Sequence, residues 1–276
     1  GHVINMPSFF FFFIYKYYSP TDYAHDALEK GYLFFNKVSR QNDPYDASFK
    51  LLQADYIKDS IKQVLPTDAE EIMKSYATCS FSKGKSNKHM WAFYAKEYSG
   101  FVIGYDENLL ENISEEYLAR IPLIEVTYSD NPITDDTFGN TFTIKNLSEP
   151  ENKNTYCYTD CMTDIKAVEA LFLYMCSLKE KEVWSMEEEV RLIIGQDVIN
   201  REDNLEKKGI AYLDKGYKIP IPKGCDKEII LGHNYKESEF CKIKSIAEKH
   251  GISIIKQTKL GNPFNLDFED ITEKVL

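Results

Sequence analysis

The chain has 276 residues, enough to bury a sizeable core, and its 43% hydrophobic and 28% charged residues exclude a disordered protein. The formal net charge of −11 disfavours indiscriminate attraction to phosphate backbones, so a nucleic-acid partner would need a local basic patch. The six cysteines include no C-x-x-C pair, which argues against a zinc site and indicates a reduced, cytoplasmic protein. Because no repeat or low-complexity linker divides the sequence, we expect residues 1–276 to form a single domain.

The chain begins with patterns that predict two strands separated by a helix. The apolar run at residues 9–18 predicts the first strand, because its FFFFFIY segment is too short to span a bilayer. Thr21 or Asp22 can cap a short helix that ends at Gly31, and YLFFN after it predicts the second strand. We therefore expect the first run to lie in a sheet and not in a membrane.

The NDPYD sequence after the second strand predicts the start of a further helix. Asp43 would be its N-cap, Pro44 its first residue and Asp46 an acid near its positive end. Apolar residues spaced along residues 49–61 would form its buried face. This structural role accounts for both acids, and catalysis is the alternative for them.

The rest of the chain alternates between strands and helices. The predicted strands are YATCSFS at 76–82, FVIGYD at 101–106, residues 121–128, residues 217–221, EIILG at 228–232 and ISIIKQT at 252–258, and the predicted helices are residues 90–100, 164–181 and 237–250. Residues 129–155, rich in Asn, Asp, Thr and Pro, predict a long surface excursion. The mixture predicts an α+β fold with a mixed, largely antiparallel sheet and flanking helices.

The sequence WSMEEEVRLII, residues 184–194, carries acids into a predicted strand. In an extended chain its branched apolar residues share one face, which packs into the core, while Glu187, Glu189 and Arg191 share the other, which faces a cleft or solvent. One interpretation is a half-exposed strand whose charges screen one another. The other is a preorganised pair of carboxylates that stabilises a cationic, oxocarbenium-like transition state.

Motifs spread along the chain carry a family resemblance. They are Y-K-Y-Y-S at 15–19, F-F-N-x-x-x-x-Q-N-D-P-Y-D at 34–46, C-S-F-S at 79–82, M-W-A-F-Y-A at 90–95, G-F-V-I-G-Y-D at 100–106, W-S-M-E-E-E-V-R-L at 184–192 and E-I-I-L-G at 228–232. In combination they resemble a large bacterial and phage-associated family of domains of unknown function. The likeness extends from about Tyr15 to Phe268, and the family name implies no activity.

Some of these segments are also similar, more loosely, to ADP-ribosyltransferase-like domains. Those domains present, in order, a basic residue on the first strand, an S-x-S strand and E-x-E on a later strand, all lining a cleft that binds NAD. Lys16, the S-F-S of residues 80–82 and the E-E-E of residues 187–189 occur in that order. Lysine stands where these domains have arginine or histidine, and it lacks the planar fork that grips a phosphate in two places.

The second similarity implies a transferase or hydrolase that uses NAD. Glu189 would stabilise the ribosyl cation as nicotinamide leaves, Glu187 would orient the acceptor, and Arg191 would keep one of these acids ionised. The residues that would bind the dinucleotide are Lys16, Ser80, Ser82, Trp91 and Tyr94, the last two by stacking on a ring.

Other interpretations of these residues stay open. Trp91 and Tyr94 could pack in the core. The acceptor could be a protein, a nucleic acid or water, and the type of domain is compatible with an intracellular toxin or a phage-defence effector. The same cleft could belong to a non-enzymatic module that binds a nucleotide or a basic segment of a partner. A metal-dependent nuclease built on Glu187 and Glu189 is a third hypothesis, but spacing identifies no further oxygen ligands, and we predict no metal site.

Overall fold

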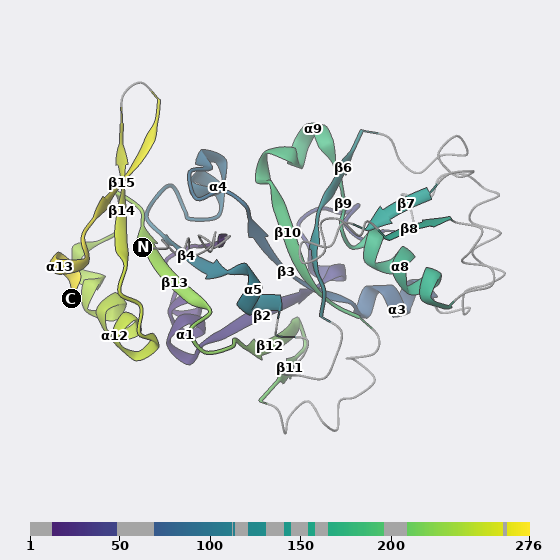
Figure 1. The fold of residues 1–276 in the computed structure, drawn as a ribbon, viewed down its shortest axis with the longest axis horizontal. Coiled ribbons are helices and arrows are strands. Elements are labelled where there is room, and N and C mark those ends of the chain that lie inside the picture. The colour runs from purple at the N-terminus through teal and green to yellow at the C-terminus, as the bar shows by residue number, and fades with distance from the viewer. Residues whose placement is uncertain are drawn as a thin grey trace, which may run out of the picture.

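The computed structural model describes residues 13–48, 69–111, 113, 121–130, 141–144, 154–157, 165–195, 209–261 and 264–276. It confirms the predicted fold class, since an α+β arrangement surrounds a mixed, mostly antiparallel sheet (Figure 1). None of the described helices combines the length and the apolar character needed to cross a membrane.

The helices and strands have the following bounds. The strands of the main sheet are β1 (Phe13–Tyr18), β2 (Tyr32–Lys37), β3 (Ala77–Ser82), β4 (Phe101–Asp106), β5 (Leu123–Glu125), β10 (Glu189–Ile194), β11 (Ala211–Leu213), β12 (Gly216–Pro220), β13 (Asp226–Leu231), β14 (Ile255–Leu260) and β15 (Leu266–Asp270). Two small sheets pair β6 (Thr127–Ser129) with β9 (Leu178–Glu180) and β7 (Thr141–Ile144) with β8 (Asn154–Cys157). The helices are α1 (Asp22–Lys30), α3 (Ala69–Ser75), α4 (Lys88–Phe93), α5 (Glu107–Glu111), α8 (Ile165–Met175), α9 (Lys181–Trp184), α12 (Phe240–His250) and α13 (Thr272–Val275), with 3₁₀ turns η1 (Val38–Arg40), η4 (Ser185–Glu187) and η6 (Glu237–Glu239).

The main sheet branches at β3. Its hydrogen-bonded path runs β11-β12-β2-β3-β1-β4-β13-β14-β15, and β10 joins from the side by pairing with β3 and β5. One edge of β3 pairs with β10 along the whole strand. The other edge pairs with β2 only at Ala77 and Thr78 and with β1 only at Ser82. Because β1 and β2 diverge, the middle of that edge has no described strand beside it.

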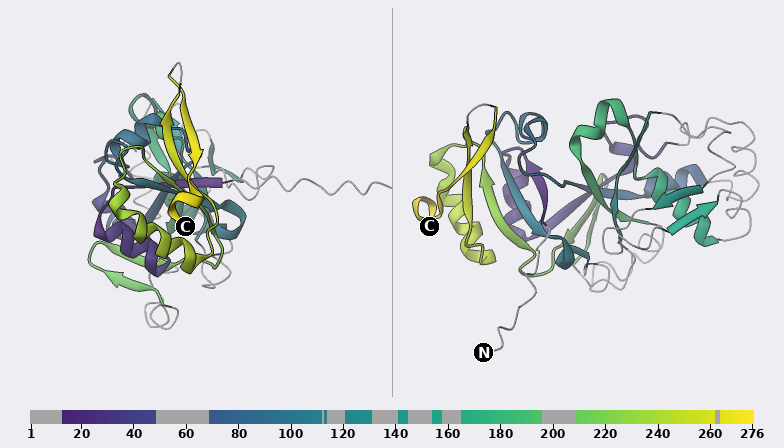
Figure 2. Two further views of the ribbon diagram at one scale, coloured as in Figure 1. Left: turned by 90° about the vertical axis from the view of Figure 1, so that its left-hand side faces the viewer. Right: turned by 45° about the horizontal axis from the view of Figure 1, so that its top comes forward.

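Two hydrophobic clusters cover opposite faces of β10. The larger cluster joins α1 and α12 to the sheet and includes Val190, Leu192 and Ile194. The second cluster joins α3 and α8 to β10 through Ile193. Figure 2 shows α12 at one end of the molecule and α8 at the other. All six residues of β10 are buried, so the alternative that its charged face is exposed to solvent is wrong, whereas Glu189 and Arg191 do line a pocket, as the alternative of a cleft predicts.

Local signals explain how the chain reaches β2. Thr21 caps α1, since its Oγ1 accepts a hydrogen bond from the backbone nitrogen of Ala24 at 3.1 Å. Gly31 ends the helix with φ of 66°, a left-handed conformation that glycine adopts with little strain. β2 begins at the next residue, so the predicted bounds of this helix and strand are confirmed.

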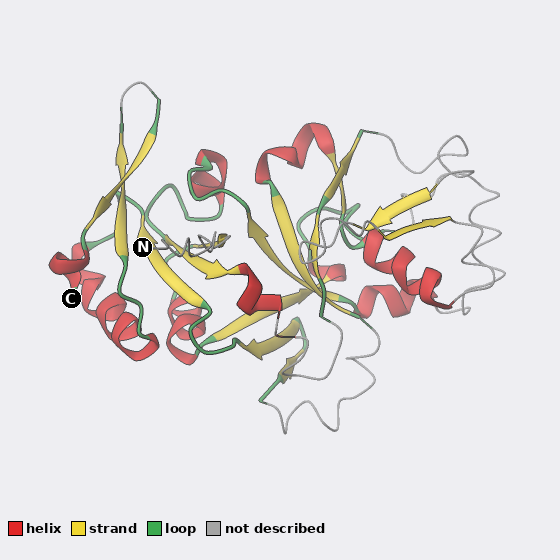
Figure 3. Cartoon of the chain, in the orientation of Figure 1, coloured by secondary structure: helices red, strands yellow, loops and turns green. Residues whose placement is uncertain are grey.

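Two predicted helices end early. The helix predicted over residues 90–100 spans Lys88–Phe93 instead, and the positive φ of Lys96, Glu97 and Tyr98 prevents a right-handed helix from reaching Gly100. The helix predicted to residue 181 stops at Met175, and the chain continues through β9 and α9 (Figure 3).

Other predicted elements differ or lie outside the description. The strand predicted over residues 121–128 divides into β5 and β6, which belong to different sheets. The predicted excursion at 129–155 contains β7, paired with β8. Residues 9–12 of the first predicted strand and residues 49–61 of the predicted helix face lie outside the described residues. The single domain stays a prediction.

Candidate functional site

A pocket of about 190 Å³ lies at the branch of the sheet. Its walls come from β1, β2, β3 and β9, from η4 and the start of β10, and from the segments around α4 and after η1. The lining residues are Tyr15, Lys16, Tyr17, Phe34, Asn36, Gln41, Asn42, Thr78, Cys79, Ser80, Phe81, Met90, Tyr94, Lys179, Glu187, Glu189 and Arg191. The pocket therefore occupies the space that opens where β1 and β2 diverge.

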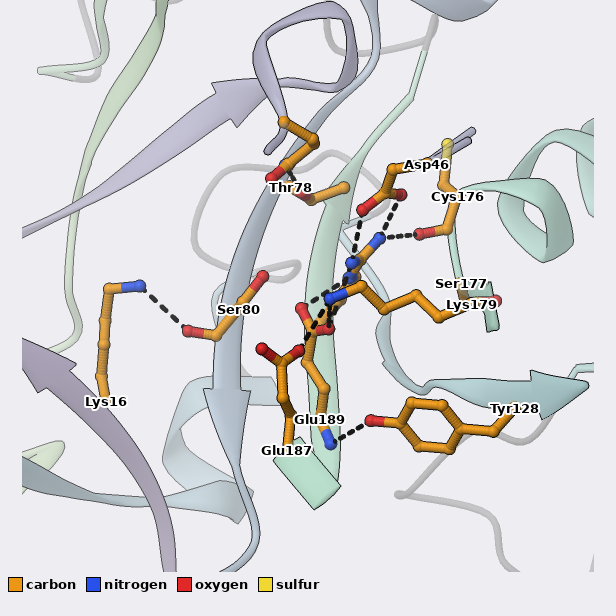
Figure 4. Close-up of polar contacts among 12 residues, drawn as sticks. Lys16, Asp46, Thr78, Ser80, Tyr128, Cys176, Ser177, Lys179, Glu187 and Glu189 are labelled. Carbon is orange, nitrogen blue, oxygen red and sulfur yellow. Dashed lines mark hydrogen bonds and ion pairs between the residues drawn. The ribbon is translucent and has the colours of Figure 1, made fainter. Parts of the chain in front are cut away.

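Lys16 reaches the open edge of β3 from β1. Its Nζ donates a hydrogen bond to the backbone oxygen of Ser80 at 2.9 Å and lies 5.3 Å from the centre of the Phe81 ring. The bond satisfies a carbonyl group that no described strand pairs. In Figure 4, Lys16 approaches Ser80 from one side, while Glu187 and Glu189 lie on the other.

Glu189, the first residue of β10, is 3% exposed and ionised. Its Oε1 accepts a hydrogen bond from Arg191 Nε at 2.7 Å, and its Oε2 accepts one from Lys179 Nζ at 2.9 Å. Burial raises the pKa of Glu189, but Arg191 and Lys179, with the Ser80 hydroxyl, outweigh burial and lower that pKa to about 2. A carboxylate is therefore present in the pocket at neutral pH.

Arg191 connects three parts of the chain. Its Nη1 and Nη2 donate to the two carboxylate oxygens of Asp46, each at 2.7 Å, in a two-pronged pairing. Its Nη1 also donates to the backbone oxygen of Cys176 at 2.7 Å. Burial lowers the pKa of Arg191, but Glu189 and Asp46 outweigh burial and hold that pKa well above its ordinary value. The acid that Arg191 keeps ionised in the pocket is thus Glu189.

Glu187 comes to the pocket from a turn and not from the strand. It ends η4, Glu188 follows in a left-handed conformation with φ of 46°, and β10 begins at Glu189. The prediction that the two acids alternate along one strand is therefore wrong. Their carboxylates nevertheless meet at Lys179, whose Nζ donates to Glu187 Oε2 at 2.7 Å and to Glu189 Oε2 at 2.9 Å. The hydroxyl of Tyr94 donates to the other oxygen of Glu187 at 2.5 Å.

Two predicted dinucleotide-binding residues do not line the pocket. Ser82 is buried, and its hydroxyl donates to the backbone oxygen of Gly84 at 3.4 Å. Trp91 is buried, and its Nε1 donates to the backbone oxygen of Lys85 at 2.8 Å, so it packs in the core. Tyr94 differs because α4 ends before it, and it lines the pocket.

The structure also brings to the site Asp46, for which the sequence favours a role at a helix start, and Lys179, which no sequence signal marks. Asp46 is predicted as an acid in the first turn of a helix, but its buried carboxylate pairs with Arg191. Lys179 falls within a predicted amphipathic helix, where a lysine on the polar face does not indicate a functional site, but it lies on β9. Gln41, whose Nε2 donates to Thr78 Oγ1 at 2.6 Å, also lines the pocket. The available signal for this side of the site was the polar Q-N-D-P-Y-D motif directly after an apolar strand.

The charged side chains at the pocket balance one another although the chain is acidic. Lys16, Lys179 and Arg191 are positive, and Glu187, Glu189 and Asp46, which pairs with Arg191 behind the lining, are negative. The whole chain carries −11. The site is therefore less negative than the chain as a whole. In the described part of the chain, no group of three or more His, Cys, Asp or Glu side chains is arranged to hold a metal ion.

Comparison with known proteins gives a family likeness without an activity. A family model described as Protein of unknown function (DUF2971) matches residues 90–192. This match supports the predicted resemblance to a family of domains of unknown function. No curated protein and no solved structure matches the chain. Within the matched stretch lie Tyr94, Lys179, Glu187, Glu189 and Arg191.

Proposed function

We propose that the chain is an NAD-using enzyme that transfers ADP-ribose to an acceptor or hydrolyses NAD. The observation that carries this proposal is that Lys16, Ser80 and Glu189, from three different strands, line one pocket. A cation, a hydroxyl and a carboxylate in these strands are the combination that the similarity to ADP-ribosyltransferase-like domains implies. The acceptor is a protein, a nucleic acid or water.

The ionised state of Glu189 supports this chemistry. When the bond between C1′ of the ribose and the nicotinamide nitrogen breaks, the electron pair leaves with nicotinamide and positive charge develops on the ribose. A carboxylate that is already fixed in place stabilises this charge without reorganisation. An acceptor oxygen or nitrogen then bonds to C1′ and loses its proton, and Glu187, beside Glu189, orients that acceptor.

Lys16 supports binding of a phosphate group. Lys16 uses one hydrogen of its ammonium group on the Ser80 carbonyl, and an ammonium group has two more to donate. It can therefore contact a phosphate oxygen while it remains bonded to β3.

The size of the pocket limits which part of NAD it encloses. Its volume of about 190 Å³ is below the roughly 300–1,000 Å³ of pockets that enclose drug-sized ligands. The nicotinamide ribose is the part that reacts, and it is the part that needs the carboxylates. We therefore assign the nicotinamide ribose to the pocket and the rest of the dinucleotide to the surface outside it.

The bonding of the acids favours a second candidate, a binding module without turnover. Both oxygens of Glu187 and both oxygens of Glu189 already accept hydrogen bonds within the chain. Buried ion networks of this kind also serve structure alone. A binding module would hold the same ligand and leave it unchanged. No comparable observation favours the nuclease hypothesis, because the described residues offer no cluster of metal ligands.

Nicotinamide release from labelled NAD tests the enzymatic proposal. We expect the Glu189→Gln variant to release about 100-fold less nicotinamide than the wild type, because the fixed negative charge at the ribose is lost. Glu125→Gln is the matched control, since Glu125 lies on β5 beside β10, pairs with Lys83 and does not line the pocket. Its release should equal that of the wild type.

Thermal unfolding of each variant shows whether the variant is folded. This control is needed because Glu189→Gln leaves the buried Arg191 with one carboxylate partner. Lys16→Met, at the half-buried edge of the pocket, gives a second variant and should raise the KM for NAD. Equal release from Glu189→Gln and the wild type, or no release from the wild type with any acceptor, would reject the proposal.

A further inference from the structure

The mouth of the pocket lies on the side of β2. Among the lining residues, Asn36 and Asn42 are exposed and Phe34 is partly exposed. The lining residues from β9 and β10 are buried. A ligand longer than the pocket can therefore leave it beside β2.

An aromatic and cationic surface begins at this mouth. The ring of Phe34 lies 5.7 Å from the ring of Tyr23 on α1, and Tyr23 is 47% exposed. Lys218 of β12 is the cross-strand partner of Phe34, and its Nζ lies 4.4 Å from the centre of the Tyr32 ring and 5.5 Å from that of Tyr23. The labels α1, β2 and β12 adjoin below the centre of Figure 1. Tyr23, Tyr32, Phe34 and Lys218 are termed the aromatic shelf.

Neighbouring charges hold the shelf in position and leave it positive. Asp26 accepts a hydrogen bond from the Tyr32 hydroxyl at 2.8 Å, and its Oδ2 lies 3.6 Å from Lys218 Nζ. Lys30 pairs with the other oxygen of Asp26. Two positive charges and one negative charge give this surface a formal balance of +1. An anionic group that arrives from the pocket would therefore meet favourable charge.

We propose that the aromatic shelf binds the purine nucleotide half of the dinucleotide, with the base stacked on Tyr23 and a phosphate oxygen at Lys218. The inference rests on the proposed function, which leaves this half of the ligand outside the pocket. An exposed aromatic ring stacks on any purine base, and a nearby ammonium group suits the phosphate that accompanies it. Because Phe34 lines both the pocket and the shelf, one ligand can occupy the two without a gap.

Calorimetric dissociation constants for NAD, nicotinamide mononucleotide and AMP test this assignment. We expect Tyr23→Ala to weaken binding of NAD and AMP about tenfold, because the stacking of one base is lost. Binding of the mononucleotide should not change, since it occupies the pocket alone. Lys218→Met should weaken NAD and AMP in the same way. Phe264→Ala is the matched control, since Phe264 is an 88% exposed aromatic residue between β14 and β15, and it should change none of the three.

The outcomes separate this inference from the proposed function. If Tyr23→Ala binds NAD as tightly as the wild type, the aromatic shelf is not the purine site, and the proposed function stands. If Tyr23→Ala weakens NAD and the mononucleotide equally, the substitution acts on the pocket and the inference is again overturned. If the wild type binds AMP in a Tyr23-dependent way but neither binds nor cleaves NAD, the shelf stands and the proposed function falls. If the wild type binds neither AMP nor NAD, both are overturned.

Discussion

Five charged side chains form a continuous buried network that runs from Asp46 through Arg191, Glu189 and Lys179 to Glu187. Taking these groups out of water is unfavourable, so such a network adds little stability as a whole, whereas the loss of one member leaves a buried charge without its partner. The effect of the network is therefore mainly geometric. It holds two carboxylates at fixed places in the pocket.

Acid should remove the stabilising contribution of Glu189. The pKa of this residue is about 2 in the folded chain and 4.5 for an ordinary glutamate. Because the folded pKa is the lower one, Glu189 stabilises the fold above about pH 4.5, by on the order of 3 kcal/mol, and this contribution is lost as the pH falls toward 2. Urea denaturation should show that the wild type and Glu189→Gln differ less in free energy of unfolding at about pH 2 than at about pH 5. A difference that does not change with pH would contradict an ionised Glu189.

Residues in short motifs could be found from the sequence, and residues defined by distant contacts could not. Lys16, Ser80 and Glu189 each stand in a recognisable motif, and all three line the pocket. Lys179 joins the acids only because β9 brings it beside β10, and no local pattern marks it. Spacing along a helix left both a core position and a ligand contact open for Trp91 and Tyr94, and the structure places Trp91 in the core and Tyr94 at the pocket.

At the scale of elements, Asp46 ties the segment after η1 to β10. Asp46→Ala should lower the free energy of unfolding by about 3–5 kcal/mol, because the buried charge of Arg191 would lose one of its two carboxylate partners. Urea denaturation measures this change. Glu70→Ala serves as the control, since Glu70 forms an exposed pair with Lys74 one helical turn away and its loss should cost under about 1 kcal/mol. Equal effects of the two substitutions would show that Asp46 does not tie the segment to the strand.

Predicted bounds agree with the structure where residues at the ends of a helix or strand give a strong signal. α1 has both a capping threonine and a terminal glycine, and its bounds agree with the sequence. The apolar and charged pattern continues unchanged from α8 through β9 to α9, so the sequence could not indicate the two breaks. The turn before β10 depends on Glu188 in a left-handed conformation, which is uncommon for a residue other than glycine.

For the whole molecule, the class of the fold could be predicted from its mixture of patterns, and the branch of the sheet could not. The branch depends on which distant strands pair with β3 and in which register, and strand periodicity fixes only which side chains face the core. The location of the pocket follows from that pairing. The sequence could therefore name several site residues without showing the space that they enclose.

Ligand binding should be visible in the stability of the whole molecule. NAD at about a hundredfold excess over its dissociation constant should raise the free energy of unfolding by about 2.7 kcal/mol, since the unfolded chain has no pocket. Thermal unfolding with and without NAD measures the stabilisation. The NAD concentration determined before and after the experiment measures its consumption. A stabilised protein with NAD unconsumed would favour the binding module over the enzyme, and an unchanged stability would speak against both.

The hydrogen bond from Lys16 to the Ser80 carbonyl joins two strands of the sheet, β1 and β3, through a side chain. Elsewhere in the sheet, backbone hydrogen bonds join neighbouring strands. At Ser80, the flexible side chain of Lys16 makes the link instead. Lys16 of β1 is thus joined to β3 by its side chain at the level where β1 and β2 diverge. A bound anion that takes over the ammonium group would release this link and leave every backbone hydrogen bond between the strands in place.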